Sequence, residues 1–163
     1  MSISTGHGDE GSTEIFSGTS VPKDHPQIEF IGVLDELNSF LGDAKAAALR
    51  ESTKTVIDSV QRDLFRVPVL LDAPDAKDDG GIDPERLTAL IRELEERHPM
   101  RGFIIPGANP ASAKLDIART VCRRAERRLH TLHRQEPAPP RLLRYINRLS
   151  DLLFMLARAE EGE

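Results

Sequence analysis

Residues 115–132, LDIARTVCRRAERRLHTL, interleave aliphatic or small side chains with charged ones in a pattern that decides the fold. The apolar positions recur at steps of three and four, along Leu115, Ala118, Cys122, Ala125, Leu129 and Leu132. This spacing places them on one side of an α-helix, where they form the seam that packs against other helices. The stretch therefore predicts a long helix that Asn109 caps and Pro110 begins.

Four other segments carry the same periodicity. Seams of three- and four-residue steps are predicted over 30–48, 57–71, 84–98 and 142–156, and Pro68 should kink or end the second of these helices. The aromatic content is only 4%, which suits helix packing better than a β-sandwich. The sequence predicts an all-α fold, a five-helix antiparallel bundle, in which residues 1–26 form an N-terminal loop and 27–163 one helical domain.

The bulk composition excludes several classes of protein. A net charge of −5 argues against a general nucleic-acid binder, which needs a broad basic surface. The single cysteine, Cys122, allows neither an intramolecular disulfide nor a cysteine-based metal site, and its place on the seam predicts a small core residue. The chain contains no apolar run long enough for a membrane span and no signal-like segment, so a cytoplasmic location is expected.

The arginines of the opening stretch fall on different sides of the predicted helix. Arg119, Arg123 and Glu126 flank the seam, Asp116 and His130 extend this stripe, and Arg127 lies one turn after Arg123. Arg124 and Arg128 are expected to point further out. Two interpretations remain open here: a solvated face with weak ion pairs, or a clamp for an anion such as phosphate.

Other polar residues beside the seams strengthen the second interpretation. Asp35 and Asn38 adjoin the seam residue Leu34, where an unpaired carboxylate is costly, so an arginine on a neighbouring helix is the expected partner of Asp35. The last predicted helix adds Asn147 and Arg148.

The segment TGHGDEGST, residues 5–13, is a second candidate anion site. Its glycines free the backbone to direct successive N–H groups at a phosphate, although the Gly-Lys-Ser/Thr ending of a Walker motif is absent. Lys23 follows and could add a positive charge. Such a glycine-rich segment is also typical of a mobile terminus.

Together these segments resemble a known family. The stretches STGHGDEGST, VPKDHP, GVLDELNSFLG, FIIPGANPASAKLDIARTVCRRAERR and YINRLSDLLFMLAR follow, in order, the motifs of the ATP:cob(I)alamin adenosyltransferases of the propanediol-utilisation type. The resemblance implies a five-helix bundle that assembles into a homotrimer with active sites between subunits. It implies transfer of the 5′-deoxyadenosyl group from ATP to the cobalt of reduced cobalamin, with Mg²⁺ on the triphosphate and no protein metal site. It also implies a corrinoid reductase and an adenosylcobalamin-dependent enzyme as partners.

The resemblance assigns site residues by position. The ATP contacts would come from Thr5, Gly8, Asp9, Gly11, Thr13, Lys23, Arg123, Glu126, Arg127 and Asn147. Arg119 would pair with Asp35 across a subunit boundary, and Phe103 would help to keep the lower ligand away from the cobalt.

The chain also departs from the family pattern around the phosphates. Gly6 and Ser20 stand where basic residues are usual, Glu10 adds a negative charge, and Asp116 replaces a histidine. An alternative is therefore a non-catalytic paralogue that binds a corrinoid or nucleotide as a carrier, chaperone or regulator. A ferritin-like metal bundle is a third hypothesis, but Glu95 and His98 supply only one of the two Glu-x-x-His motifs it needs.

Overall fold

The computed structural model describes residue 4 and residues 6–72, 82–100 and 102–162. Within these ranges the elements are β1 (Ser12–Glu14), β2 (Ser20–Pro22), α1 (Pro26–Ala47), α2 (Glu51–Leu64), α3 (Val67–Asp72), α4 (Pro84–Arg97), α5 (Pro110–His133) and α6 (Pro140–Glu160). The expected ATP contact Thr5 and residues 73–81, between the second and third predicted helices, lie outside the described residues.

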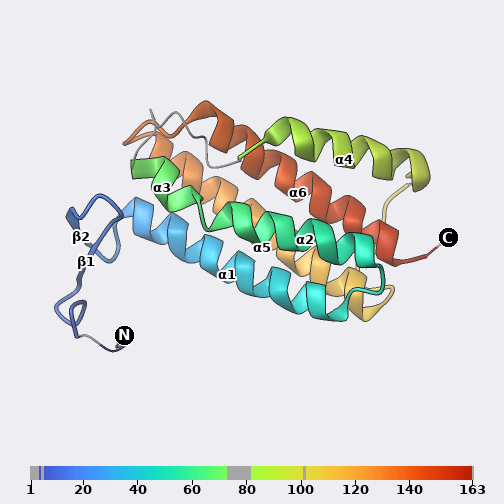
Figure 1. The fold of residues 1–163 in the computed structure, drawn as a ribbon, viewed down its shortest axis with the longest axis horizontal. Coiled ribbons are helices and arrows are strands. Elements are labelled where there is room, and N and C mark those ends of the chain that lie inside the picture. The colour runs from blue at the N-terminus through green and yellow to red at the C-terminus, as the bar shows by residue number, and fades with distance from the viewer. Residues whose placement is uncertain (1–3, 5, 73–81, 101, 163) are drawn as a thin grey trace.

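The five long helices α1, α2, α4, α5 and α6 alternate in direction along the chain, and Figure 1 shows them as one elongated bundle. Helix α5 packs against both α1 and α6, and α4 packs against α6. Because α4 and α6 run the same way, this neighbouring pair is parallel. The all-α prediction is confirmed, but the purely antiparallel arrangement is wrong for this one contact.

The predicted helix boundaries are confirmed where capping residues set them. The Asp83 carboxylate accepts hydrogen bonds from the backbone N–H groups of Glu85 (2.9 Å) and Arg86 (3.1 Å), and Pro84 begins α4. Asn109 and Ser112 form a capping box at the start of α5. These side chains satisfy backbone donors that the first helical turn leaves without partners.

The second predicted helix is divided at residues 65–66 into α2 and the six-residue α3. Pro68 lies in the first turn of α3, where its missing N–H removes no helical hydrogen bond. The predicted effect of Pro68 is thus confirmed as a break, and the described part of the chain has one more short helix than expected.

The N-terminal segment is more ordered than the predicted loop. Residues 12–14 and 20–22 form a small antiparallel hairpin in which Thr13 pairs with Val21. Asp72 at the end of α3 ties this hairpin to the bundle, because its carboxylate accepts hydrogen bonds from the Ser17 N–H (2.7 Å) and the Gln27 amide (2.5 Å). Strands this short carry too little periodicity to be recognised in the sequence.

The core is mostly aliphatic, with Phe30 and Tyr145 fully buried in it, and every seam residue of α5 is buried. The core also contains one acid that links three helices. Asp63 of α2 accepts a hydrogen bond from the Tyr145 hydroxyl (2.7 Å) on α6 and pairs with Arg86 of α4. Its partners thus offset the cost of burying a carboxylate. No helix in the described ranges has the length and apolarity to cross a lipid bilayer.

Candidate functional site

Four of the arginines of α5 form two sets, and one set, together with Lys114, binds α1. Arg128 pairs with Glu29 (3.1 Å), Arg124 pairs with Glu36, and Lys114 pairs with Asp43 (2.5 Å). Arg128 is exposed, as expected, whereas Arg124 is half-buried because α1 lies along that side of α5. The heptad spacing of the three α1 acids is the sequence signal that could have revealed these pairs.

The other set lines a hollow between α4, α5 and α6 of about 280 Å³. Arg119 and Arg123 of α5 meet Arg148 of α6 there, and we call this space the arginine hollow. Glu95 and Asp151 also line it. The exposed Arg123 has no ion pair with any residue in the described ranges, so its guanidinium is available to an anion.

A second hollow of about 400 Å³ borders the first, and Arg148 lines both. Its wall includes Glu126 and His130 of α5 and Asn147 of α6, and we call it the amide hollow. The Asn147 amide donates to the Glu126 carboxylate (2.8 Å), and its oxygen accepts from Arg148 (2.6 Å). The structure therefore brings the predicted residues Glu126 and Asn147 together, but Arg127 lines neither hollow.

The acidic partner of Arg119 lies on the same helix, α5. Its Nε donates to Asp116 Oδ1 (3.1 Å), and Asp116 Oδ2 accepts a hydrogen bond from Arg158 of α6 (2.6 Å). No sequence pattern pointed to Arg158, which stands in an apolar run 42 residues from its partner.

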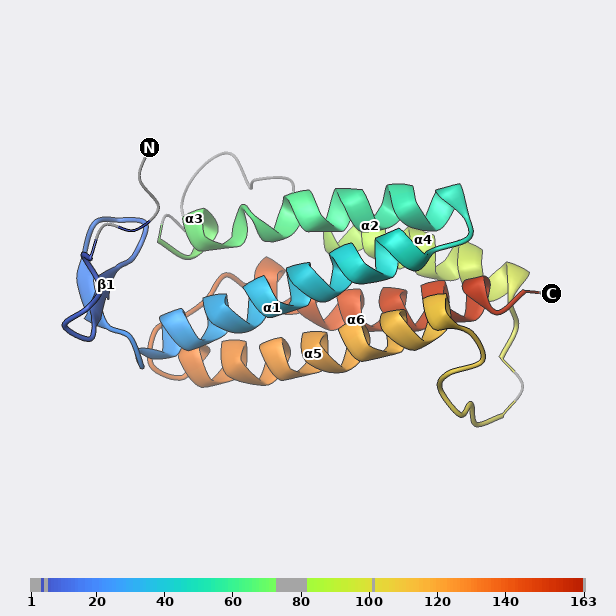
Figure 2. The ribbon, with the colours of Figure 1, turned by 90° about the horizontal axis from the view of Figure 1, so that it is seen from below.

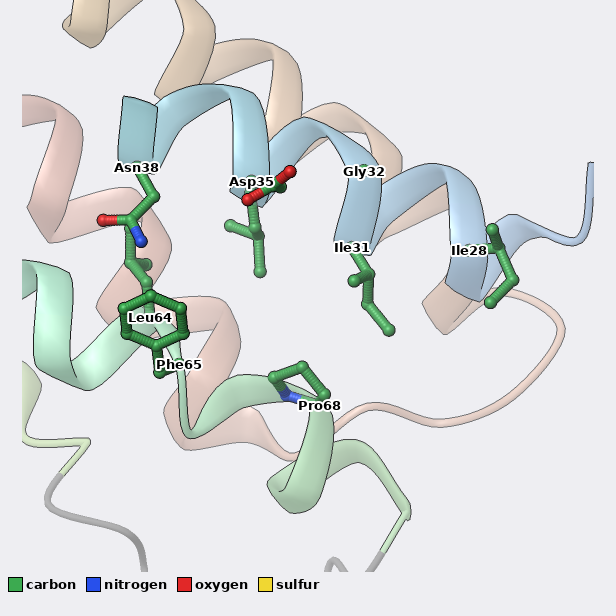
Figure 3. Close-up of a pocket in the computed structure, with 9 residues that line it drawn as sticks. Ile28, Ile31, Gly32, Asp35, Asn38, Leu64, Phe65 and Pro68 are labelled. Atoms are coloured by element: carbon green, nitrogen blue, oxygen red, sulfur yellow. The ribbon is translucent and has the colours of Figure 1, made fainter. Parts of the chain in front are cut away.

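Asp35 lies elsewhere, beside an apolar pocket of about 330 Å³ between α1 and the α2–α3 junction. Figure 3 shows Asp35 and Ile31 on α1, with Phe65 and Pro68 on the facing segment. The side-chain oxygen of Asn38, which also lines this pocket, is buried without a hydrogen-bond partner among the described residues. Asp35 and Arg119 thus line different hollows, and the single chain does not pair them.

The N-terminal loop is folded back onto Lys23. Its backbone turns through hydrogen bonds from Asp9 N–H to Gly6 O (3.2 Å) and from Lys23 N–H to Gly11 O (3.0 Å). A Cβ on Gly8 would lie 3.0 Å from the Lys23 amine, so a larger residue at this position would have to displace the end of the Lys23 side chain. The predicted loop residues Gly8, Asp9, Gly11, Thr13 and Lys23 therefore belong to one folded unit.

None of the described residues of this unit lines the arginine hollow or the amide hollow. Figures 1 and 2 both show it beyond the N-terminal end of α1, away from α4. Phe103, in the connection from α4 to α5, is fully exposed, and Ile105 beside it is nearly so. A single chain therefore presents its candidate residues on separate surfaces.

Two hypotheses about reactive groups can be examined directly. Burial raises the pKa of the Cys122 thiol far above its ordinary value, so the group stays protonated, and it donates to the Ile146 carbonyl oxygen (3.5 Å). This supports the core role predicted for Cys122. In the described part of the chain no three acidic, histidine or cysteine side chains converge as a metal site, so Glu95 and His98 gain no support as ligands.

A family comparison decides between the remaining classes of protein. The model of the cobalamin adenosyltransferase family matches residues 3–160. The chain belongs to the cobalamin adenosyltransferase family. Family membership accounts for the bundle and for the sequence motifs on α1, α5 and α6.

Individual members of the family are similar over the whole chain. The corrinoid adenosyltransferase PduO of Salmonella typhimurium is 40% identical over 171 residues, which cover 100% of this chain and 51% of that protein. The chain thus spans about half the length of the PduO proteins that it matches. A corrinoid adenosyltransferase of Citrobacter freundii is 38% identical over 98% of this chain and 94% of its own.

Solved structures of the family share the fold. A variant of the PduO-type ATP:corrinoid adenosyltransferase from Lactobacillus reuteri, complexed with cobalamin and ATP, superimposes with a TM-score of 0.86 at 31% identity. The match covers 98% of this chain and 91% of that one. A second variant from the same organism, complexed with ATP, gives a TM-score of 0.82 at 33% identity.

Proposed function

We propose that this protein is an ATP:cob(I)alamin adenosyltransferase, which moves the 5′-deoxyadenosyl group of ATP to the cobalt of reduced cobalamin and releases triphosphate. The observation that carries the proposal is the arginine hollow beside the Asn147–Glu126 pair, in a chain that matches the family over nearly its full length. Guanidinium groups suit phosphate oxygens, and an amide paired with a carboxylate can hold the polar edge of a nucleoside.

The active site is completed by a neighbouring subunit in a homotrimer. The loop that carries Thr5, Gly8, Asp9, Gly11, Thr13 and Lys23 would close over Arg123, Glu126, Arg127 and Asn147 of the next chain. This arrangement is supported by the linings of the two hollows, which include none of the described loop residues of the same chain. It is also supported by the separation of Asp35 from Arg119, which would pair across the same boundary.

The corrinoid would lie between the pocket beside Asp35 of one subunit and the exposed Phe103 and Ile105 of the next. Large apolar side chains left in water mark a surface that another molecule covers, and a corrin ring offers apolar faces. Phe103 would help to exclude the lower axial ligand of the substrate. That exclusion favours the four-coordinate corrinoid, which is easier to reduce.

The chemistry requires no nucleophile from the protein. The electron pair of cobalt(I) in the substrate forms the bond to C5′ of ATP, the C5′–O bond breaks, and triphosphate leaves with its charge. The protein's contribution is to align the two substrates and to offset the developing negative charge with arginines. Mg²⁺ would travel with the triphosphate and keep most of its water ligands. The expected reductase, downstream enzyme and cytoplasmic location complete the proposal.

A non-catalytic paralogue is the alternative that a specific observation favours. Gly6 adopts φ +71°, a conformation in which an arginine or lysine would be strained. The backbone conformation therefore disfavours the basic side chain that the sequence lacks at this position. Ser20 offers no charge either, and Glu10 opposes an anion.

Product analysis separates the two functions. The protein is incubated without oxygen with ATP, Mg²⁺ and chemically reduced cobalamin, and the products are quantified by chromatography. The transferase should form adenosylcobalamin and triphosphate in equal amounts. Bound corrinoid with unchanged ATP would instead support the paralogue.

A further inference from the structure

We infer that Asp116 is a positioning residue, which holds the Arg119 guanidinium in the orientation needed to bind a carboxylate or phosphate. The inference rests on the proposed function, in which Arg119 is part of the active site. It concerns a position where this chain differs from the family pattern, and it is carried by the contacts around one buried carboxylate.

The Asp116 carboxylate is buried, and both of its oxygens have arginine partners. Its side chain is 5% exposed, and each of its two oxygens accepts a hydrogen bond from a different arginine, Arg119 at 3.1 Å and Arg158 at 2.6 Å. A buried carboxylate remains charged only when such partners surround it. The position of Asp116 is therefore fixed from two helices at once.

Arg158 has more additional contacts than Arg119. Arg158 also donates to Glu161 (2.8 Å), and its guanidinium lies 4.9 Å from the centre of the Phe154 ring. Arg119 lies 5.9 Å from the same ring and has no acid other than Asp116 within the described part of the chain. Removing the Asp116 carboxylate would thus release Arg119 first.

The contact uses only one of the donors of Arg119. Its Nε binds Asp116, whereas its two terminal nitrogens have no hydrogen-bond partner in the ranges that the structure describes, and its side chain is 24% exposed in the arginine hollow. A guanidinium anchored at Nε presents its terminal nitrogens as a pre-set fork for a carboxylate or phosphate. An unanchored arginine would lose side-chain entropy each time it bound.

The test compares Asp116→Asn with the wild type in the transferase assay. The new amide offers a single acceptor oxygen, which the more deeply buried Arg158 should keep, so that an N–H group faces Arg119. We expect kcat to fall about tenfold or more because misplaced groups lose orientation, while the KM for ATP stays nearly unchanged. Asp116→Glu, which keeps the charge but moves it by one methylene, should retain the fold and show a smaller loss.

Two controls separate positioning from simple support of the fold. Glu161→Gln removes the other acid of Arg158 but leaves Arg119 untouched, so turnover should match the wild type even if the melting temperature falls. Adding Asp116→Asn to Arg119→Ala should cause no further loss of turnover. Independent, multiplying losses in the double variant, or wild-type turnover in Asp116→Asn, would overturn the inference.

A readout without catalysis keeps the inference separate from the proposed function. In wild-type protein the Arg119 Nε–H should give an NMR signal protected from solvent exchange. Asp116→Asn should lose that protection, and Glu161→Gln should keep it. A protected signal in an inactive wild type would contradict only the proposed function, and an unprotected one would contradict the role of Asp116.

Discussion

Asn147 connects the two groups that give the amide hollow its polarity. Its amide donates to Glu126, and its oxygen accepts from Arg148. Asn147→Ala should weaken ATP binding by about tenfold or more, because the loss of a charge-assisted hydrogen bond leaves both neighbours misoriented. Isothermal titration with ATP and Mg²⁺ measures the effect. Gln135→Ala, an exposed amide just beyond α5, is the matched control and should bind as the wild type does.

Ser20 offers a way to restore one missing charge. It lies exposed in β2, close in sequence to Lys23, and a strand residue accepts a long side chain without strain. Ser20→Arg should lower the KM for ATP about tenfold, since a charged phosphate contact is worth about 1.5–3 kcal/mol. Ser20→Ala should leave the KM unchanged. An equal KM in both variants would show that residue 20 does not face the triphosphate.

Cys122 reports on the integrity of the core. Because burial raises its thiol pKa, the folded protein should react with a thiol reagent no faster at pH 9 than at pH 7. The chain unfolded in urea should react faster as the pH rises through the ordinary thiol range. Rapid, pH-dependent labelling of the native protein would mean that the α5–α6 seam opens readily.

The helices could be predicted from the sequence because their seams and caps are local features. Asn109 caps the helix that it was expected to cap, and Pro68 breaks the second helix. The hairpin was missed because three-residue strands carry too little pattern. The parallel α4–α6 contact was missed because α4 docks on α6 partly through Arg86, Asp63 and Tyr145, a network that joins three helices far apart in the sequence.

This network should matter for stability and not for chemistry. Tyr145→Phe removes a hydroxyl that donates to the buried Asp63 carboxylate, and it should lower the free energy of unfolding by about 1.5–3 kcal/mol. Urea unfolding at constant pH measures the change. Thr55→Ala, whose hydroxyl bonds only to the Glu51 carbonyl of its own exposed turn, should stay within about 0.5 kcal/mol. Equal stabilities would mean that Asp63 needs only Arg86.

For the whole molecule, the sequence could name candidate site residues but could not bring them together. Arg119, Arg123, Glu126 and Asn147 were identified from helix phase and motif, and the structure gathers them around two adjoining hollows. Asp35, Phe103 and the glycine loop lie on other surfaces of the same chain. A contact between subunits leaves no periodic signal within one chain, so its partners cannot be placed from spacing alone.

The proposed trimer depends on opposite charges at Asp35 and Arg119, which would meet between subunits. The wild type should sediment at three times the 18.1 kDa mass of the chain. Asp35→Arg should weaken assembly because it would face Arg119 with a like charge, and adding Arg119→Asp should restore assembly. Sedimentation velocity over a range of protein concentrations measures both effects. A double variant no better assembled than Asp35→Arg would show that these residues do not meet.

The most direct test of the whole account is the dependence of turnover on Arg123, the arginine in the hollow that has no acid within the described ranges. Conversion of cob(I)alamin to adenosylcobalamin is followed by absorbance without oxygen, at varied ATP, for the wild type, Arg123→Ala and the distant control Arg134→Ala. The account predicts turnover by the wild type and the control, and a loss in kcat/KM for ATP of about 10- to 100-fold in Arg123→Ala. Equal turnover in all three proteins would contradict the assignment of the arginine hollow to the triphosphate.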